Sequence, residues 1–237
     1  MRISFFLISF LYQPILLAQL YLPKSEGEIV KHSYIIMSYN EKHEQANWVF
    51  YKLNQRNING DSKRKDNFRP DPFVSSGSAE LIDYKDSGYD RGHLAPAGDM
   101  KMTNNSMSES FYLSNISPQY PSFNRGGWKR LETLIRKWAT SKSLNIYTAG
   151  ILGNDLNSIG PNQVSIPRKF YKIIFDTSNE NVIGFIMPNQ KILKELRSFV
   201  VSIDEIEDST GIEFFSEMED YKENELESNI DLLNWDF

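Results

Sequence analysis

The 237-residue chain contains no cysteine, which excludes disulfide bonds, thiolate metal sites, a cysteine nucleophile and a cysteine-linked lipid anchor. It has only three histidines, His32, His43 and His93, and none has a second histidine at metal-binding spacing. We therefore expect ordinary structural roles for His32 and His43. Internal repeats and long low-complexity tracts are also lacking, so the chain is expected to form one compact domain after a removable leader.

No apolar run in the sequence reaches the roughly 20 residues that a membrane-spanning helix needs. Residues 1–19 begin with a positive charge at Arg2, continue with short apolar runs and end on small or polar residues. This order is typical of a secretory signal peptide, and Pro14 argues further against a spanning anchor. The alternative is a buried N-terminal helix or strand. We expect a signal peptide over 1–19, a mature domain over 20–237 that starts near Gln19 or Leu20, a periplasmic or secreted location, and no stable membrane anchor.

Positive charge is in slight deficit overall, with a net charge of -5. However, residues 195–237 hold 14 acidic and 2 basic residues, which leaves 24 basic and 17 acidic residues in 1–194. An acidic segment of this kind is usually a solvated face, and its sign identifies no partner. The remaining positive charge permits contacts with phosphates without demanding them.

Alternation and β-branched content predict strands over residues 29–39, 48–51, 144–152, 169–175 and 182–187. Short helices are expected over 100–110 and 198–207. Strict alternation of strands with helices is rare here. The sequence therefore predicts an α+β fold with a mixed or antiparallel central sheet.

The stretch Gly88 to Pro96 places a carboxylate, a guanidinium, a glycine and an imidazole at Asp90, Arg91, Gly92 and His93. Glycine permits a tight, irregular turn, the arginine fork suits phosphate oxygens, and histidine accepts a proton near neutral pH. This combination predicts phosphate binding beside a general base. The alternative is structural: Asp90 caps a helix and pairs with Arg91, and His93 is an ordinary hydrogen-bonded histidine.

The strongest helical pattern covers residues 124–140, where apolar residues recur three and four positions apart and basic residues occupy the opposite side. Asn124 stands near its start, where free amide groups favour anions. Glu132 and Arg136 are four apart and share a face, an arrangement that is ordinarily a surface salt bridge. A basic loop over 52–69 precedes the Gly92 stretch.

Three motifs, read in order, resemble the DNA/RNA non-specific endonucleases, the sugar-non-specific nucleases with a ββα-metal site that include mitochondrial endonuclease G. They are residues 90–93, residues 114–119, and Asn124 with Trp128, Leu131 and Glu132. The resemblance extends from about residue 64 to residue 185.

The resemblance implies a role for each matching position. His93 corresponds to the general base that deprotonates the attacking water, and Asn124 to the one protein side chain that holds a divalent metal. Glu132 corresponds to the residue that orients metal-bound water, and Asn115 to the asparagine that braces the site. The arginines placed around the phosphate correspond to Arg64, Arg91 and Arg136, although Lys63, Lys65 and Arg69 compete with Arg64 for its place.

The implied cofactor is Mg²⁺, with Mn²⁺ also possible, because magnesium keeps several waters and needs few protein ligands. The implied substrates are DNA and RNA, since arginines that hold phosphates position a strand without reading its bases. Two other functions stay open from the residues alone. One is a nucleic-acid-binding module without catalysis, and the other is a metal-dependent phosphodiesterase for small substrates.

Overall fold

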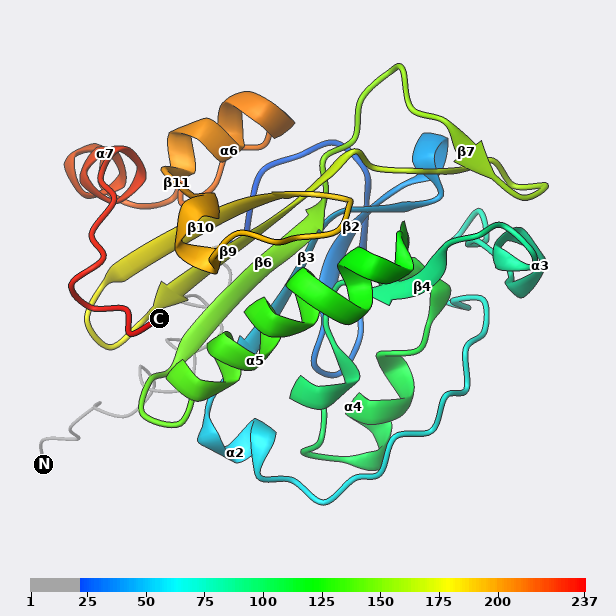
Figure 1. The fold of residues 1–237 in the computed structure, drawn as a ribbon, viewed down its shortest axis with the longest axis horizontal. Helices are drawn as coiled ribbons and strands as arrows, with labels where there is room; N and C mark the ends of the chain where they lie inside the picture. The colour runs from blue at the N-terminus through cyan, green and yellow to red at the C-terminus, as the bar shows by residue number, and fades with distance from the viewer. Residues whose placement is uncertain (1–21) are drawn as a thin grey trace, which may run out of the picture.

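A computed structural model describes residues 22–237 of the chain, so the expected signal peptide over 1–19 lies outside the described residues. A seven-stranded antiparallel sheet forms its centre, in the order β1-β2-β3-β6-β9-β10-β11 (Figure 1). Its strands are β1 (Glu28–Lys31), β2 (Ile36–Asn40), β3 (Gln45–Leu53), β6 (Leu144–Gly150), β9 (Lys169–Asp176), β10 (Asn181–Pro188) and β11 (Val200–Val201).

Two small strand pairs complete the β-structure: β4 (Asp90–His93) with β5 (Ile116–Gln119), and β7 (Ser158–Ile159) with β8 (Val164–Ser165). The helices are α2 (Gln55–Ile58), α3 (Leu81–Tyr84), α4 (Asn104–Glu109), α5 (Lys129–Trp138), α6 (Ile203–Thr210) and α7 (Asp220–Ser228). Short turns are η1 (Glu41–His43), η2 (Ala97–Asp99), η3 (Leu113–Asn115), η5 (Leu196–Phe199) and the π-helical η4 (Phe123–Trp128). The expected α+β fold with an antiparallel sheet is confirmed.

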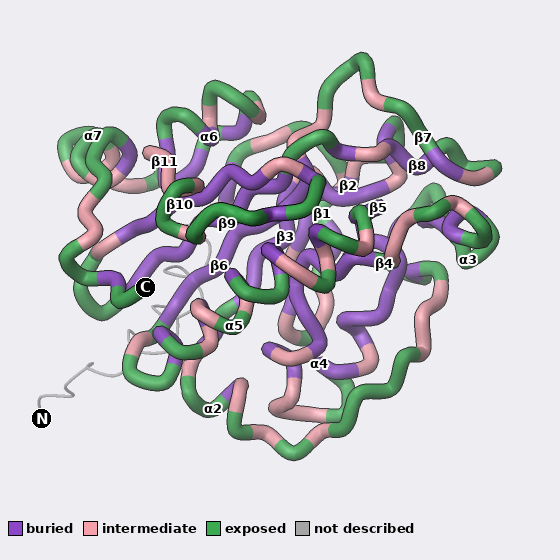
Figure 2. The backbone as a smooth tube through the Cα atoms, in the orientation of Figure 1, coloured by how far each residue is buried: buried purple, intermediate pink, exposed green. Residues whose placement is uncertain are grey.

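Helices cover both faces of the large sheet, and its central strands β6, β9 and β10 are consequently buried along almost their whole length (Figure 2). On one face α5 packs with Trp138 stacked on Phe185 of β10. The adjacent Gly184 points the other way, toward Ile203 and Ile206 of α6. The acidic C-terminal helices therefore lie on the face opposite to α5.

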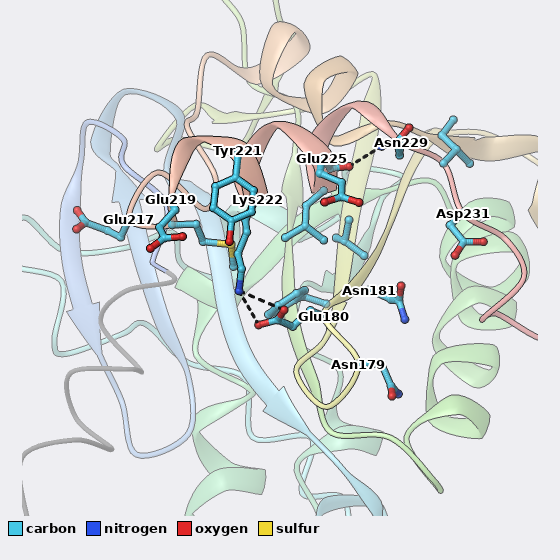
Figure 3. A pocket seen from close by; sticks show the side chains of 15 residues that line it. Asn179, Glu180, Asn181, Glu217, Glu219, Tyr221, Lys222, Glu225, Asn229 and Asp231 are labelled. Carbon is cyan, nitrogen blue, oxygen red and sulfur yellow. Dashed lines mark hydrogen bonds and ion pairs between the residues drawn. The ribbon is translucent and has the colours of Figure 1, made fainter.

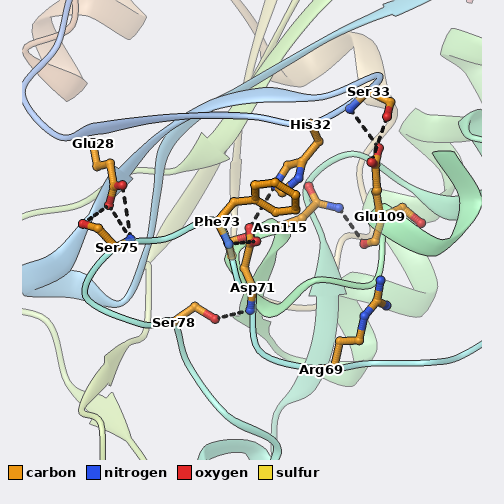
Figure 4. A network of polar contacts seen from close by, with 12 residues as sticks. Glu28, His32, Ser33, Arg69, Asp71, Phe73, Ser75, Ser78, Glu109 and Asn115 are labelled. Carbon is orange, nitrogen blue, oxygen red and sulfur yellow. Dashed lines mark hydrogen bonds and ion pairs between the residues drawn. The ribbon is translucent and has the colours of Figure 1, made fainter. Parts of the chain in front are cut away.

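The first expected strand, 29–39, is in fact a hairpin of β1 and β2. Distant side chains fix its turn (Figure 4). His32 Nε2 lies 2.9 Å from Asp71 Oδ2, and Ser33 donates through its backbone nitrogen and hydroxyl to the Glu109 carboxylate at 3.0 and 2.9 Å. Burial alone would raise the pKa of Asp71, but hydrogen bonds from His32 and Ser114 hold it below its usual value. The Asp71 contact fastens the loop that precedes β4, and the Glu109 contacts fasten the end of α4.

The other expected strands match β3, β6, β9 and β10, with β3 extending well beyond residues 48–51. The expected helix over 198–207 begins later, at Ile203, because η5 and β11 occupy the preceding residues. The expected helix over 124–140 is divided into the π-helical η4 and the α-helix α5.

None of the helices within residues 22–237 is long and apolar enough to cross a membrane.

Candidate active site

The candidate site is built on two short antiparallel strands followed by a helix. Asp90 pairs with Gln119 and His93 pairs with Ile116 across β4 and β5, and η4 with α5 follow directly in the sequence. The expectation of a tight turn at Gly92 is wrong, because Gly92 lies in strand β4. A Cβ atom there would come within 2.3 Å of the buried Gln119 side chain, so glycine is required by space.

Asn115 is fully buried and clamps the chain just beyond His93. Its Oδ1 accepts from the backbone nitrogen of Ala95 at 2.9 Å, and its Nδ2 donates to the carbonyls of Ala95 and Ser110 at 2.9 and 2.8 Å. On the opposite side, Trp128 Nε1 donates to the His93 carbonyl at 3.4 Å. The backbone at and just beyond His93 is thus held by side chains from both η3 and η4.

The His93 imidazole is buried against two aromatic rings, with centroid distances of 5.4 Å to Phe68 and 5.0 Å to Phe111. Within residues 22–237 its Nε2 atom has no hydrogen-bond partner. Burial, with added repulsion from Arg64 and Arg91, lowers the pKa of His93 to about 3. The ring is consequently neutral at pH 7 and able to accept a proton.

Both arginines that influence His93 are held by the same aromatic cluster. The Arg91 guanidinium lies 4.3 Å above the Phe68 ring, and that of Arg64 lies 5.1 Å from the Phe111 centroid. Arg64 also pairs with the exposed Asp66 at 2.6 Å. Arg69, a competing candidate, donates instead to the Ser108 carbonyl at 3.0 Å, which is a structural contact.

Asn124 is positioned by a carboxylate from β4. Its Nδ2 donates to Asp90 Oδ2 at 2.9 Å, and Arg125 binds both oxygens of the same carboxylate at 2.8 and 2.6 Å. Burial alone would raise the pKa of Asp90, but these hydrogen bonds hold that pKa below its usual value. Because a carboxylate only accepts, the Asn124 amide is oriented with Oδ1 turned away from Asp90.

Asp90 therefore neither caps a helix nor pairs with Arg91. Its partner is Arg125, 35 residues along the chain.

Glu132 and Arg136 share a face of α5, but Arg136 binds another carboxylate. Arg136 Nη1 lies 2.8 Å from Asp99 Oδ1, and Tyr51 donates to Asp99 Oδ2 at 2.9 Å. Glu132 makes no hydrogen bond or ion pair with any residue in 22–237, so its oxygens stay free to accept. Burial raises the pKa of Glu132 to about 7; Lys172 opposes this rise and Asp99 adds to it.

Two features on the remote side of the sheet contain none of the expected site residues. A hollow of about 860 Å³ lies between α7 and the β9–β10 turn, where Lys222 pairs with Glu180 at 3.4 Å (Figure 3). Among the described residues, one group of three side chains of metal-ligating type was found, namely Asp204, Glu207 and Glu227. Both features belong to the acidic C-terminal layer.

Comparison with known proteins agrees with this geometry. Residues 17–221 match the family model described as DNA/RNA non-specific endonuclease. The chain belongs to that family. It is therefore a nuclease, and the expected resemblance and enzyme class are confirmed.

Several relatives are similar over most of this chain. A nuclease of Nostoc sp. is 34% identical over 220 residues, which is 86% of this chain and 78% of the relative. Nuclease C1 of Cunninghamella echinulata is 36% identical, covering 83% of this chain and 86% of the relative. The mitochondrial nuclease EXOG of Danio rerio is 34% identical over 86% of this chain, which spans 66% of that longer protein.

A solved structure extends the likeness to three dimensions. The crystal structure of the EndoG/EndoGI complex matches with a TM-score of 0.75 and 28% identity, covering 82% of this chain and 88% of the matched chain. The ββα arrangement of β4, β5 and α5 thus belongs to a fold shared with a nuclease.

Three participants were not expected from the sequence: Asp90 as the support of Asn124, Asp99 as the partner of Arg136, and Lys172 beneath α5. Lys172 had a detectable signal, because a lone lysine within the apolar stretch of residues 170–175 indicates a buried cation. No local sequence signal predicts the contact between Arg125 and Asp90.

The Asp90 contact predicts a hierarchy of variants. Asp90→Ala releases the Asn124 amide, so we expect nuclease activity to fall about 10- to 100-fold, as for other groups that orient a ligand. Arg125→Ala removes only an exposed partner and leaves the Asn124–Asp90 bond, so the loss should stay below about threefold. Plasmid cleavage rates measure both. Equal losses in the two variants would contradict this role for Asp90.

Proposed function

We propose that this nuclease hydrolyses phosphodiester bonds of DNA and RNA with little sequence preference, using His93 as general base and a divalent cation held by Asn124. The observation that carries the proposal is the neutral, buried His93 ring with an unpartnered Nε2 atom, on the same short strand that positions Asn124. Family membership supplies the reaction class, and these side chains supply the roles.

His93 accepts the proton of the attacking water, whose oxygen then bonds to phosphorus as the bond to the leaving sugar oxygen breaks. The low pKa of His93 reflects burial and two nearby arginines, so the free ring is a weak base. A bound phosphate diester carries negative charge and offsets those arginines. Substrate binding therefore makes His93 a stronger base when it is needed.

Arg64 and Arg91 both act electrostatically on His93 and pack on the rings beside it, and we assign them to the phosphate oxygens. Arg136 donates through Nη1 to Asp99 and through Nη2 to Thr133, and its side chain is 25% exposed, so we assign it a contribution of positive charge at the edge of the site. Asn115 acts on the backbone alone. Because these cations address phosphate rather than bases, weak sequence preference and strong salt dependence are expected.

The donor set fits a hard cation. Asn124 Oδ1 in η4 accepts no hydrogen bond from residues 22–237, and Glu132 has free carboxylate oxygens in α5, the helix that follows directly. A neutral amide oxygen with few other protein groups suits Mg²⁺ or Mn²⁺, which keep their waters, and it suits zinc poorly. When bound, the cation supplies neutralisation of the phosphate charge and stabilisation of the leaving alkoxide. Glu132 accepts hydrogen bonds from water in the site.

His93→Ala should lower the cleavage of plasmid and of RNA by about 10²- to 10⁴-fold, the usual contribution of a general base. His43→Ala is a matched control, because it also removes a buried imidazole but one that contacts Ser165 instead. Chelator should abolish activity in the parent, and added Mg²⁺ or Mn²⁺ should restore it.

Full activity in excess chelator would contradict the cation, and an unimpaired His93→Ala protein would contradict the base. Cleavage of a small phosphodiester without any cleavage of DNA or RNA would favour a phosphodiesterase for small substrates. Binding of nucleic acid without cleavage would favour a non-catalytic module.

We further propose that the nuclease is exported to the periplasm or secreted, on the strength of the charged, apolar and small-residue order over residues 1–19. Mass spectrometry of the exported protein should then find an N-terminus at Gln19 or Leu20. Recovery with residues 1–18 intact would contradict cleavage of a signal peptide.

A further inference from the structure

Lys172 is a fully buried lysine in the central strand β9, at 0% exposure. It lies on the sheet face covered by α5, as does Phe170 two residues earlier, whose ring centroid is 5.7 Å from that of Trp128. Burying an ammonium group is costly unless charges and hydrogen bonds compensate it. The fold therefore places a cation, whose burial costs free energy, directly beneath the active site.

The Lys172 ammonium contacts two parts of the site. Its Nζ donates to the carbonyl of Leu94 at 3.3 Å, one residue beyond His93. It also lies 4.7 Å from the ring centroid of Trp128, whose own Nε1 donates to the His93 carbonyl. Lys172 thus connects the large sheet to the backbone behind the general base.

Four charged groups, Asp99, Glu132, Arg136 and Lys172, act on one another electrostatically, and the ion pair found among them joins Asp99 to Arg136. Asp99 is satisfied by the direct ion pair with Arg136 and by the Tyr51 hydroxyl. Glu132 has no such partner within residues 22–237. Among the cations that act on it, Lys172 has the largest influence on its pKa. The charged and titratable groups with the largest influence on Glu132 are Asp99 of η2, Lys129 and Arg136 of α5, and Lys172 of β9, and Glu132 in turn acts on Tyr51 of β3.

We propose that Lys172 is a positioning residue of this nuclease, which fixes the chain behind His93 and keeps the Glu132 carboxylate ionised from beneath the site. The inference rests on the proposed function, because ionised Glu132 matters only if it orders water for hydrolysis. Lys172 itself touches neither substrate nor cation.

Electrostatics supports the same assignment. Burial raises the pKa of Glu132 to about 7, and the positive charge of Lys172 is the largest influence that opposes this rise. Burial also lowers the pKa of Lys172 to about 8, while Glu132 and Asp99 favour its charged form. Removing the ammonium should therefore raise the pKa of Glu132 further, so that it is protonated at neutral pH.

The test compares Lys172→Met, which removes the charge at similar length, with Lys172→Arg, which retains it. Lys137→Met is the matched control, because Lys137 is exposed on α5 and is not among the charges with the largest influence on Glu132. Each pKa unit changes the ionised fraction up to tenfold, so Lys172→Met should lower kcat about tenfold or more at pH 7 and much less at pH 9. The acid limb of the kcat–pH profile should move to higher pH in Lys172→Met. In Lys172→Arg and Lys137→Met it should stay at the pH of the parent.

A second readout does not depend on activity. Carboxyl ¹³C NMR of metal-free protein, with the Glu132 signal assigned by its loss in Glu132→Gln, should show Glu132 titrating at higher pH in Lys172→Met. Adding Lys172→Met to Glu132→Gln should lower kcat much less than it does in the parent, because the two changes act through one group.

An unchanged Glu132 titration in folded Lys172→Met overturns the proposal. So does a loss of kcat that is equal at every pH, because that indicates a purely structural role. If Lys172→Met does not fold, an acid limb of Lys172→Arg displaced from that of the parent overturns it. Should the parent fail to cleave nucleic acid, the proposed function fails, whereas the NMR titration still tests Lys172.

Discussion

The register between β4 and β5 is the constraint on which the rest of the site depends. Side chains alternate along a strand, so a slip of one residue would turn His93 away from Phe68 and Phe111 and move Asp90 out of reach of Asn124. A pair of four-residue strands is too short to fix this register by itself. The buried amide of Asn115 and the indole of Trp128 hold the end of β4 in place, through hydrogen bonds with the backbone of Ala95 and of His93.

Charge is distributed in two layers across the large sheet. The α5 face contains the arginines around His93 and a group of interacting charges, in which Arg136 pairs with Asp99 and the positive charge of Lys172 acts on Glu132. The opposite face contains the acidic helices α6 and α7. An acidic net charge is therefore compatible with a polyanionic substrate, because the negative layer is separated from the site by the sheet.

The sequence predicted the elements whose pattern is local. The spacing of Leu131, Ile135 and Trp138 identified α5, and the apolar stretches identified β9 and β10. The motif order identified the family. It also selected His93 and Asn124, whose environments suit the roles expected of them.

What could not be predicted depends on contacts between distant residues. The turn between β1 and β2 contains no glycine or proline and is fixed by Asp71 and Glu109, 39 and 76 residues away from their partners. Gly92 was expected in a turn, but the volume of Gln119 rather than a special backbone angle requires it. The π-helical η4 was not predicted either, and the close packing of its Gly127 on Ile192, 65 residues along the chain, has no local sequence signal.

The central claim is that a neutral imidazole and an amide-held cation act on the same phosphate. Anomalous diffraction from crystals soaked in Mn²⁺ tests it most directly. We expect a peak at Asn124 Oδ1, with Asn124 as the one direct protein ligand of the ion and His93 facing the same space. A peak found only among Asp204, Glu207 and Glu227, on the far side of the sheet, would contradict it.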